Sequence, residues 1–248
     1  MSANNLPSGI GDLFQLGERM LGGLRRHGRW LLKESFPADE FSGRLLATRE
    51  AETKLALARA ARGEAGRKFA ACDLELTSWL AKARLVVMLA YGNKWSESWI
   101  AAGFTHRGTN VPKRIAPRIE LCQRLADFFA GHEEYEVPFA RVTAAEARRQ
   151  KKEITAAEKA VRLARQKMSE RKRVRDVAEK KLRHEMHFVV VYLGCAIGKR
   201  DPRWRAFGLK QPRTDAEPID VYCKATPSSP AIEVDFAAAD VKLSSAVA

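Results

Sequence analysis

Apolar residues recur three and four positions apart along most of this chain, and that spacing is typical of one face of a helix. The pattern predicts a helix over residues 9–34, interrupted or weakened by Gly22, Gly23 and Gly28. A longer helix is expected to begin after Pro37 and to run to Tyr91, because Gly92 supplies the stop signal that commonly follows a helix. The first third of the chain therefore predicts two helices.

The rest of the apolar pattern predicts two more helices, separated by loops. Pro117 suits the first turn of a helix that ends at Gly131. Thr143 and Glu146 have the spacing of a capping box, and no Gly or Pro follows them until after Leu193. A second long helix is therefore expected over residues 143–193.

The two long helices carry matching apolar seams with heptad spacing. The first seam reads Leu55, Arg62, Phe69, Leu76 and Ala83, and the second reads Ala147, Ile154, Val161, Met168, Arg175, Leu182 and Val189. The segments AETKLALARAARGEAGR (51–67) and AEKAVRLARQKMSERKR (157–173) align with a shift of 106 residues. Trp99 and Trp204 follow at a shift of 105. These matches predict an internal duplication.

The fold class we expect is all-α: an elongated antiparallel helical bundle built from an internally duplicated long helix. Residues 1–36 would form an N-terminal helix. Residues 37–208 would form the bundle, with repeat units at about 51–104 and 157–208 and a linking helix at 117–131. Residues 209–248 are rich in proline and predict an extended C-terminal tail that is irregular or contains a short β-strand.

The repeated W…GF and W…FG motifs of NKWSESWIAAGF (93–104) and DPRWRAFGL (201–209) also suggest a relationship. Together with GDLFQLGERM near the start and the EVPFARVTAAEA junction, they resemble a group of uncharacterised bacterial helical proteins. Some of those proteins continue into a fibronectin-III-like segment, and the resemblance implies that residues 218–248 are a shortened remnant of it. The resemblance implies no known activity.

Five aromatic residues of these motifs are expected to close the ends of the bundle as structural plugs: Trp95, Trp99, Phe104, Trp204 and Phe207. Large rings at a bundle end are commonly plain packing. An aromatic recognition pocket formed by the tryptophans is the alternative. Burial of Trp99 and Trp204 against the preceding helix end is the prediction that separates the two interpretations.

Positive charge is concentrated in one segment. The chain has a formal net charge of +14, and residues 143–200 hold 17 lysines and arginines against 7 acids. On the second long helix, the basic face of residues 148–183 includes Lys152, Lys159, Arg173 and Lys180 opposite the seam. Such a ridge can follow a phosphate backbone, so nucleic-acid binding is one candidate function. A solvated charged surface is the alternative, because acids dilute the ridge and no aromatic residues interleave with it.

The chain offers few residues for catalysis. His184 and His187 lie three apart, without the four-residue spacing of a zincin motif, and GCAIGKR (194–200) lacks the spacing of a phosphate-binding loop. We therefore expect no catalytic residues, no metal site, no cofactor and no small-molecule substrate. No apolar run reaches the roughly 20 residues of a membrane span. The four cysteines show no CxxC spacing, which favours free thiols and a cytoplasmic location.

Two functions remain as hypotheses. The first is a non-enzymatic structural or protein-interaction module, with a protein partner or self-association, because long apolar seams without a catalytic constellation are typical of scaffolds. The alternative is a nucleic-acid-associated protein that uses the basic face.

Overall fold

A computed structural model describes residues 4–31, 37–104 and 108–212 of the chain. This part is all-α, as expected, and contains one isolated β-bridge but no β-strand. The α-helices are α1 (Ile10–Leu31), α2 (Ala38–Tyr91), α3 (Ser98–Ala101), α4 (Ile115–Gly131) and α5 (Ala144–Ala196). The short 3-10 helices are η1 (Glu133–Tyr135), η2 (Pro138–Ala140) and η3 (Pro202–Phe207). The expected C-terminal tail lies outside the described residues from 213 onward.

Contacts divide the chain into two compact units. Residues 40–184 form one, here called the α4 unit, and residues 1–39 with 185–248 form the other, here called the α1 unit. Both long helices contribute to both units, because α2 begins at Ala38 and α5 continues past residue 185. Each unit has its own short helix after which it is named.

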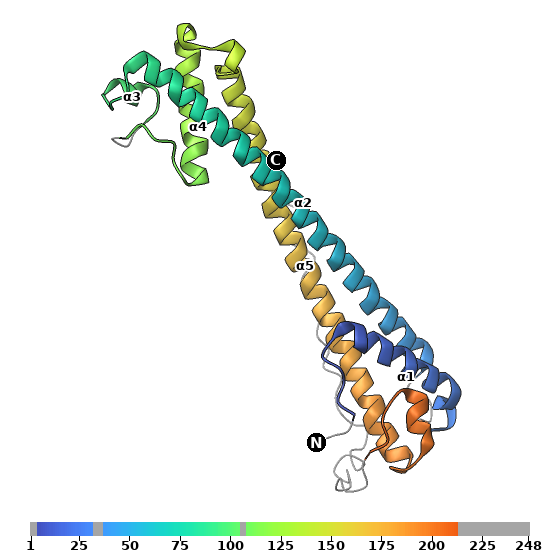
Figure 1. The fold of residues 1–248 in the computed structure, drawn as a ribbon. Helices are drawn as coiled ribbons and strands as arrows, with labels where there is room; N and C mark the ends of the chain where they lie inside the picture. Colours follow the sequence, from blue (N-terminus) through green and yellow to red (C-terminus); the bar gives the residue numbers. More distant parts are fainter. Residues whose placement is uncertain (1–3, 32–36, 105–107, 213–248) are drawn as a thin grey trace, which may run out of the picture. The chain divides into compact units, whose positions relative to one another are not determined.

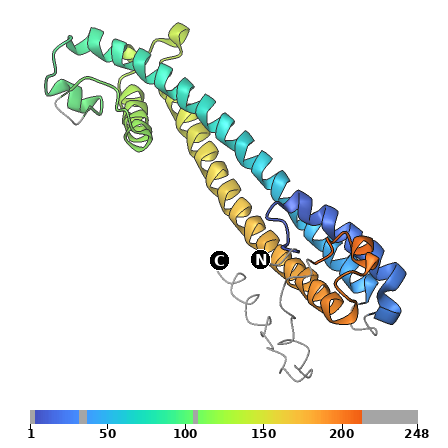
Figure 2. The same ribbon diagram turned by 60° about the horizontal axis from the view of Figure 1, so that its bottom comes forward.

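Within the α4 unit, α2 and α5 lie side by side and run antiparallel (Figures 1 and 2). The hydroxyl of Thr48 donates to the carbonyl oxygen of Ala178 over 3.4 Å, and Nη1 of Arg62 lies 4.0 Å from Sδ of Met168. Residue numbers on α5 thus decrease as those on α2 increase, which means that the two helices run in opposite directions. The expected antiparallel pairing of the two long helices is confirmed in this unit.

The seam between the long helices is well buried at its ends and thin in its middle. Leu55 and Leu76 on α2 are buried, whereas Arg62 is exposed and Phe69 is only half-buried. On α5, the seam positions from Val161 to Ala178 are half-buried. Two helices alone cannot enclose a core, so a third helix has to cover them wherever burial is complete.

That third helix in the α4 unit is α4. Its apolar face joins α2, α3 and the start of α5 in one core that includes Leu80, Trp99, Leu125, Phe129 and Ile154. Polar contacts fix the packing. The thiol of Cys122 donates to the carbonyl oxygen of Ala147 over 3.3 Å, and Arg118 pairs with Asp73 at 2.9 Å. Leu125 and Phe129 lie one helical turn apart and are fully buried, so this face of α4 provides the core.

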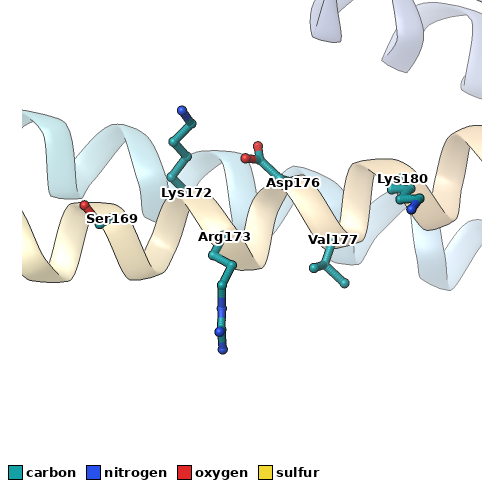
Figure 3. A pocket seen from close by; sticks show the side chains of 6 residues that line it. All are labelled: Ser169, Lys172, Arg173, Asp176, Val177 and Lys180. Carbon is teal, nitrogen blue, oxygen red and sulfur yellow. The ribbon is translucent and has the colours of Figure 1, made fainter. Parts of the chain in front are cut away.

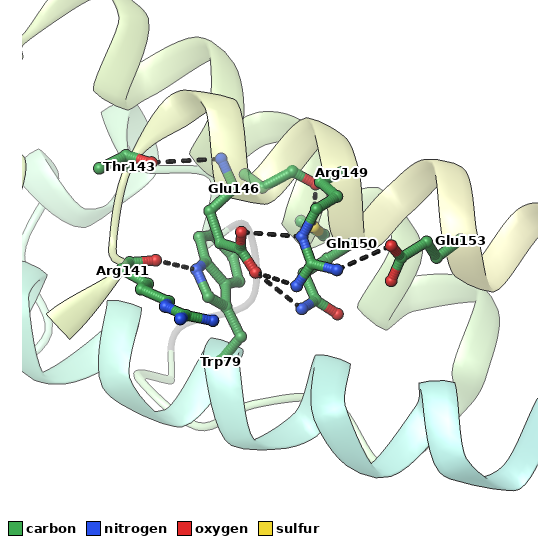
Figure 4. Close-up of polar contacts among 9 residues, drawn as sticks. Trp79, Arg141, Thr143, Glu146, Arg149, Gln150 and Glu153 are labelled. Carbon is green, nitrogen blue, oxygen red and sulfur yellow. Dashed lines mark hydrogen bonds and ion pairs between the residues drawn. The ribbon is translucent and has the colours of Figure 1, made fainter. Parts of the chain in front are cut away.

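Local signals set the end of α2 and the start of α5 where the sequence predicted them, whereas α5 continues past the expected Leu193 to Ala196. Gly92 has φ +85°, a left-handed conformation that favours glycine, directly after the last residue of α2. At the start of α5, the hydroxyl of Thr143 accepts a hydrogen bond from the Glu146 amide over 3.2 Å (Figure 4). The carboxylate of Glu146 pairs instead with Arg149 and Gln150. The pKa of the Glu146 carboxylate lies below its ordinary value, mainly because Arg149 donates hydrogen bonds to it.

The loop before α5 is attached to α2 through a buried indole. Nε1 of Trp79 donates to the carbonyl oxygen of Arg141 over 2.9 Å (Figure 4). Arg141 has φ +57°, which a non-glycine residue rarely adopts, and the bond from Trp79 stabilises this turn. The bridge between Val137 and Val142 closes the same turn.

In the α1 unit, α1 packs against η3, which lies beside it in Figure 1. The glycines of α1 do not interrupt the helix, which is continuous from Ile10 to Leu31. Gly23 explains why one of them is needed: a Cβ there would lie 2.6 Å from the ring of Phe207. The glycine is a packing requirement because it allows the Phe207 ring to approach the helix backbone.

Candidate functional site

The first candidate site is the turn after α2, which contains Trp99, Gly103 and Phe104. Both aromatic rings are buried and contact each other edge to face, with centroids 5.0 Å apart. Gly103 has φ +95°, and a Cβ on it would lie 2.4 Å from Cβ of Arg124 on α4. This turn therefore packs closely against α4, and a side chain at position 103 would force the turn away from that helix.

The turn after α5 has the same construction within the α1 unit. Trp204 and Phe207 are buried, and Nε1 of Trp204 donates to the carbonyl oxygen of Gly198 over 3.2 Å. Gly208 has φ +72°, and a Cβ on it would lie 2.6 Å from Cβ of Arg19 on α1. The predicted burial of Trp99 and Trp204 is thus observed, which favours packing over an open aromatic recognition pocket.

The two turns differ in the hydrogen bonding of their tryptophan indole N–H groups. Trp95 is only half-buried as a residue, yet its Nε1 and that of Trp99 are buried without a hydrogen-bond partner in the described part of the chain. Trp204 has such a partner in Gly198. A buried N–H without an acceptor carries an energetic cost, so the first turn is the less well satisfied of the two.

The second candidate site is the basic face of α5. Lys152, Lys159, Arg173 and Lys180 are all exposed, as the sequence predicted. They and the neighbouring Arg148 and Arg162 make no ion pair or hydrogen bond with any described residue. These six cations therefore remain available to an anionic partner.

The basic face is a ridge rather than a pocket. The six residues Ser169, Lys172, Arg173, Asp176, Val177 and Lys180 line only an open hollow on one helix. Figure 3 shows the side chains of Lys172 and Arg173 pointing away from each other. Such an arrangement can contact an extended anionic surface but cannot enclose a small molecule.

Arg175, the seam position of this segment, is paired rather than available. It lies 3.2 Å from Glu52 on α2 and also pairs with Glu179. Burial alone would raise the pKa of Glu179, but hydrogen bonds from Arg183 and Arg175 lower it. These charges hold α2 to α5 and belong to the fold, not to a binding site.

The third candidate site was not expected from the sequence and lies on the outward face of α2. Leu74, Leu85 and Leu89 are 72%, 48% and 84% exposed, and Ser78 and Ala81 between them are exposed as well. The residues Ala71, Leu74, Ser78, Ala81, Leu85 and Met88 have a and d spacing. They form a second seam, here called the outer seam. Its residues are exposed on the side of α2 opposite the buried positions, except Met88, which is half-buried and packs against the core. The same heptad count that identified the inner seam could have found it.

The residues considered for metal or thiol chemistry do not form a site. No group of three metal-ligating side chains occurs among the described residues. Burial raises the pKa of the Cys122 thiol to about 12, so it stays protonated and unreactive. Cys72 and Cys122 are free thiols, as expected, and Cys223 lies outside the described residues.

Comparison with known proteins adds no identification: no family model, no curated protein and no solved structure matches the chain. The resemblance to bacterial helical proteins with repeated tryptophan motifs therefore stays a prediction. Among the described residues, no helix combines the length and apolar character needed to cross a bilayer.

Proposed function

We propose that this protein is a non-enzymatic structural module that acts through contacts between proteins, and that it self-associates through the outer seam of α2. The exposed leucines of that seam carry the proposal. A helix normally leaves polar residues on its solvent face, and exposed apolar rows commonly mark interaction sites. Leu74 and Leu85 lie eleven residues apart on that face, and the a and d positions between them are occupied only by the small residues Ser78 and Ala81.

The occupant we propose is α2 of a second copy of the chain, in antiparallel orientation. In that arrangement, Leu74 of one copy meets Leu85 of the other, because antiparallel helices pair a positions with d positions. Ser78 then meets Ala81, and these small side chains let the two backbones approach closely. The leucine and small-residue layers are self-complementary, as a two-fold symmetric contact requires.

Charge supports the same register. Glu75 and Lys82 occupy equivalent e positions beside the outer seam, and antiparallel helices bring the e position of one copy close to that of the other. Both residues are exposed and have no ion pair within the described part of the chain. Two Glu75–Lys82 pairs would therefore form across the contact. The strongest basic face, on α5, is not part of this surface, so the net charge of +14 opposes the contact only weakly.

Sedimentation of the full-length protein over a range of concentrations tests this proposal. The parent should dimerise, and Leu85→Glu should shift it towards monomer, because two carboxylates would be buried in the contact. Leu57→Glu is the matched control, since Leu57 is an exposed leucine with the same heptad spacing on α2 but lies two heptads before the outer seam, beyond Glu64 and Arg67. Lys82→Glu should weaken the dimer, and adding Glu75→Lys to it should restore the pairing. A parent that sediments as a monomer at every concentration would refute self-association.

A second candidate function is nucleic-acid binding, supported by the six available cations on α5. A helix surface would bind the phosphates, so binding should be weak, indifferent to sequence and steeply salt-dependent. The triple variant Lys159→Glu, Arg173→Glu and Lys180→Glu should abolish the gel shift while leaving helicity unchanged, because all three side chains are exposed. For duplex DNA, removing one lysine or arginine that binds a phosphate should reduce the log–log salt slope by about 0.9. Failure of the parent to shift DNA or RNA at low ionic strength would remove this candidate.

A further inference from the structure

Several elements of the chain recur at a spacing of 105 or 106 residues. Helix α1 starts at Ile10 and α4 at Ile115, which is a shift of 105. Helix α2 starts at Ala38 and α5 at Ala144, which is a shift of 106. The short helices thus belong to the repeat, although α4 was expected to be only a link between two repeated long helices.

Burial matches at many equivalent positions of the two long helices, the two short helices and the two turns, although Leu55 and Ala58 are buried whereas their equivalents Val161 and Ala164 are only half-buried. With a shift of 106, both members are buried in the pairs Phe41/Ala147, Thr48/Ile154, Ala51/Ala157, Leu76/Leu182, Leu80/Met186, Ala83/Val189 and Val87/Leu193. With a shift of 105, the same holds for Met20/Leu125, Leu24/Phe129, Trp99/Trp204, Ala102/Phe207 and Phe104/Leu209. Similar composition can align two helices by chance, but it does not bury the same positions of two helices and a turn.

The glycines of the two turns give independent support. Gly103 and Gly208 lie 105 residues apart, both have positive φ, and each packs on Cβ of an arginine. Those arginines, Arg124 and Arg19, are also 105 residues apart. The turn that follows α2 therefore packs on α4, and the turn that follows α5 packs on α1. Each turn completes the short helix of the other repeat, so the exchange is reciprocal.

The pairing of α2 with α5 in the α4 unit has the pattern of a symmetric contact. Arg62 and Met168 are equivalent at a shift of 106, and they contact each other. A residue that meets its own equivalent lies at the two-fold axis of an isologous interface. Thr48 contacts Ala178, and the reciprocal positions, Ile154 and Cys72, both belong to the core around α4, which agrees with such symmetry.

We infer that residues 10–104 and 115–209 are two copies of one folding unit. The two copies contact each other through the same surface of each, as the subunits of an isologous dimer do. The chain is in this sense a fused dimer. This inference does not depend on the self-association proposed above, because it concerns surfaces within one chain.

The outward faces of α2 and α5 differ at equivalent positions. Lys152, Lys159, Arg173 and Lys180 are equivalent to Leu46, Thr53, Arg67 and Leu74 at a shift of 106. Leu46 and Leu74 are both exposed. Among the residues of the outer seam, only Leu74 is equivalent to one of these four cations, Lys180, so the outer seam and the basic ridge overlap at this one position of the unit.

If the two units are equivalent, the protein should fold whichever unit comes first in the chain, and a circular permutant of the complete chain tests this. A circular permutant that places residues 108–248 before residues 1–107 keeps every residue and restores the same succession of short helix, long helix and turn. The new connection is feasible because the chain before α1 already meets the chain after η3: Nδ2 of Asn4 donates to the carbonyl oxygen of Lys210 over 2.9 Å. A permutant opened between Asn93 and Lys94 is the control, because this opening lies in an exposed loop but separates the long helix α2 from its own turn.

The first permutant should keep the parental helicity, with a midpoint of thermal unfolding within about 4 °C, which corresponds to roughly 1 kcal/mol for a chain of this size. The control should unfold at a lower temperature. Loss of folding in the first permutant, or a loss as large as that of the control, would overturn the inference.

A second variant keeps the test decisive if permutation itself disturbs folding. In it, residues 93–104 and 198–209 exchange places in the otherwise unchanged chain, so each turn meets the other arginine. Equivalent turns should give a folded protein with a midpoint within the same few degrees. An unfolded product would show that the two turns are not copies of one element.

Discussion

Replacement of Gly103 or Gly208 by alanine is the sharpest test of the two turns. Each glycine combines a positive φ with a backbone that lies directly on an arginine Cβ. Alanine at either position would therefore meet two costs at once. The positive φ costs an L-residue about 1–2 kcal/mol. Overpacking of a closed site typically costs a further ~1–3 kcal/mol.

The expected loss in the free energy of unfolding is therefore about 2–5 kcal/mol at each position. The overlap is not easily relieved, because the contacted atom is the Cβ of Arg124 or Arg19, which is fixed to its helix, and not the end of a flexible side chain. Gly43→Ala and Gly194→Ala are matched controls: both glycines lie inside long helices with open space around them. These two changes should stabilise the protein by about 0.5–1 kcal/mol.

Urea unfolding followed by circular dichroism measures all four variants, with the slope checked for constancy. A double-mutant cycle separates the two costs at the first turn. Arg124→Gly removes the contacted Cβ, so Gly103→Ala should cost less in that background, leaving only the backbone strain. If both turn variants unfold within about 0.5 kcal/mol of the parent, the level of an ordinary surface substitution, the close approach of turn to helix is refuted.

Three further predictions follow from the packing and the charges. Trp99→Ala or Trp204→Ala should each cost about 3–5 kcal/mol, because each removes a buried ring, and a parental melting temperature would show that the ring does not pack. The hydrogen bond from Arg203, with other contacts, lowers the pKa of Asp201 to about 2, below its ordinary value of 3.8. The ionised Asp201 carboxylate therefore stabilises the folded state above pH 4, and this contribution is lost as pH falls towards 2. Asp201→Asn should flatten the dependence of the melting temperature on pH in that range, and an unchanged dependence would contradict this prediction. Arg175→Met should cost about 1–3 kcal/mol by leaving Glu52 without its closest cation, and adding Glu52→Gln should recover part of the loss in thermal unfolding.

The sequence alone determined the helices, because helix signals act over a few residues. Pro37, Gly92 and Gly131 mark helix ends that depend only on local backbone geometry. Thr143 caps α5 through its neighbour three residues on. The burial of Trp99 and Trp204 was also predictable, because each follows an apolar helix end.

Only the tertiary structure decided which faces of those helices are covered. Periodicity identified the inner seam of α2 but could not show that Arg62 and Phe69 lie where only two helices meet. It likewise could not show that the outer seam stays exposed, since an apolar row has the same spacing whether or not a partner covers it. Gly23 was expected to weaken α1, but the ring of Phe207, 184 positions away, makes it necessary.

The equivalence of α1 and α4 was hidden for the same reason. Their sequences share few identities, and what they have in common is the contact each makes with a distant turn. Gly103 with Arg124 and Gly208 with Arg19 are contacts between residues that only the folded chain brings together. Local chemistry fixes where a helix begins and ends, whereas its packing is set by residues up to almost two hundred positions away, whose proximity no local pattern records.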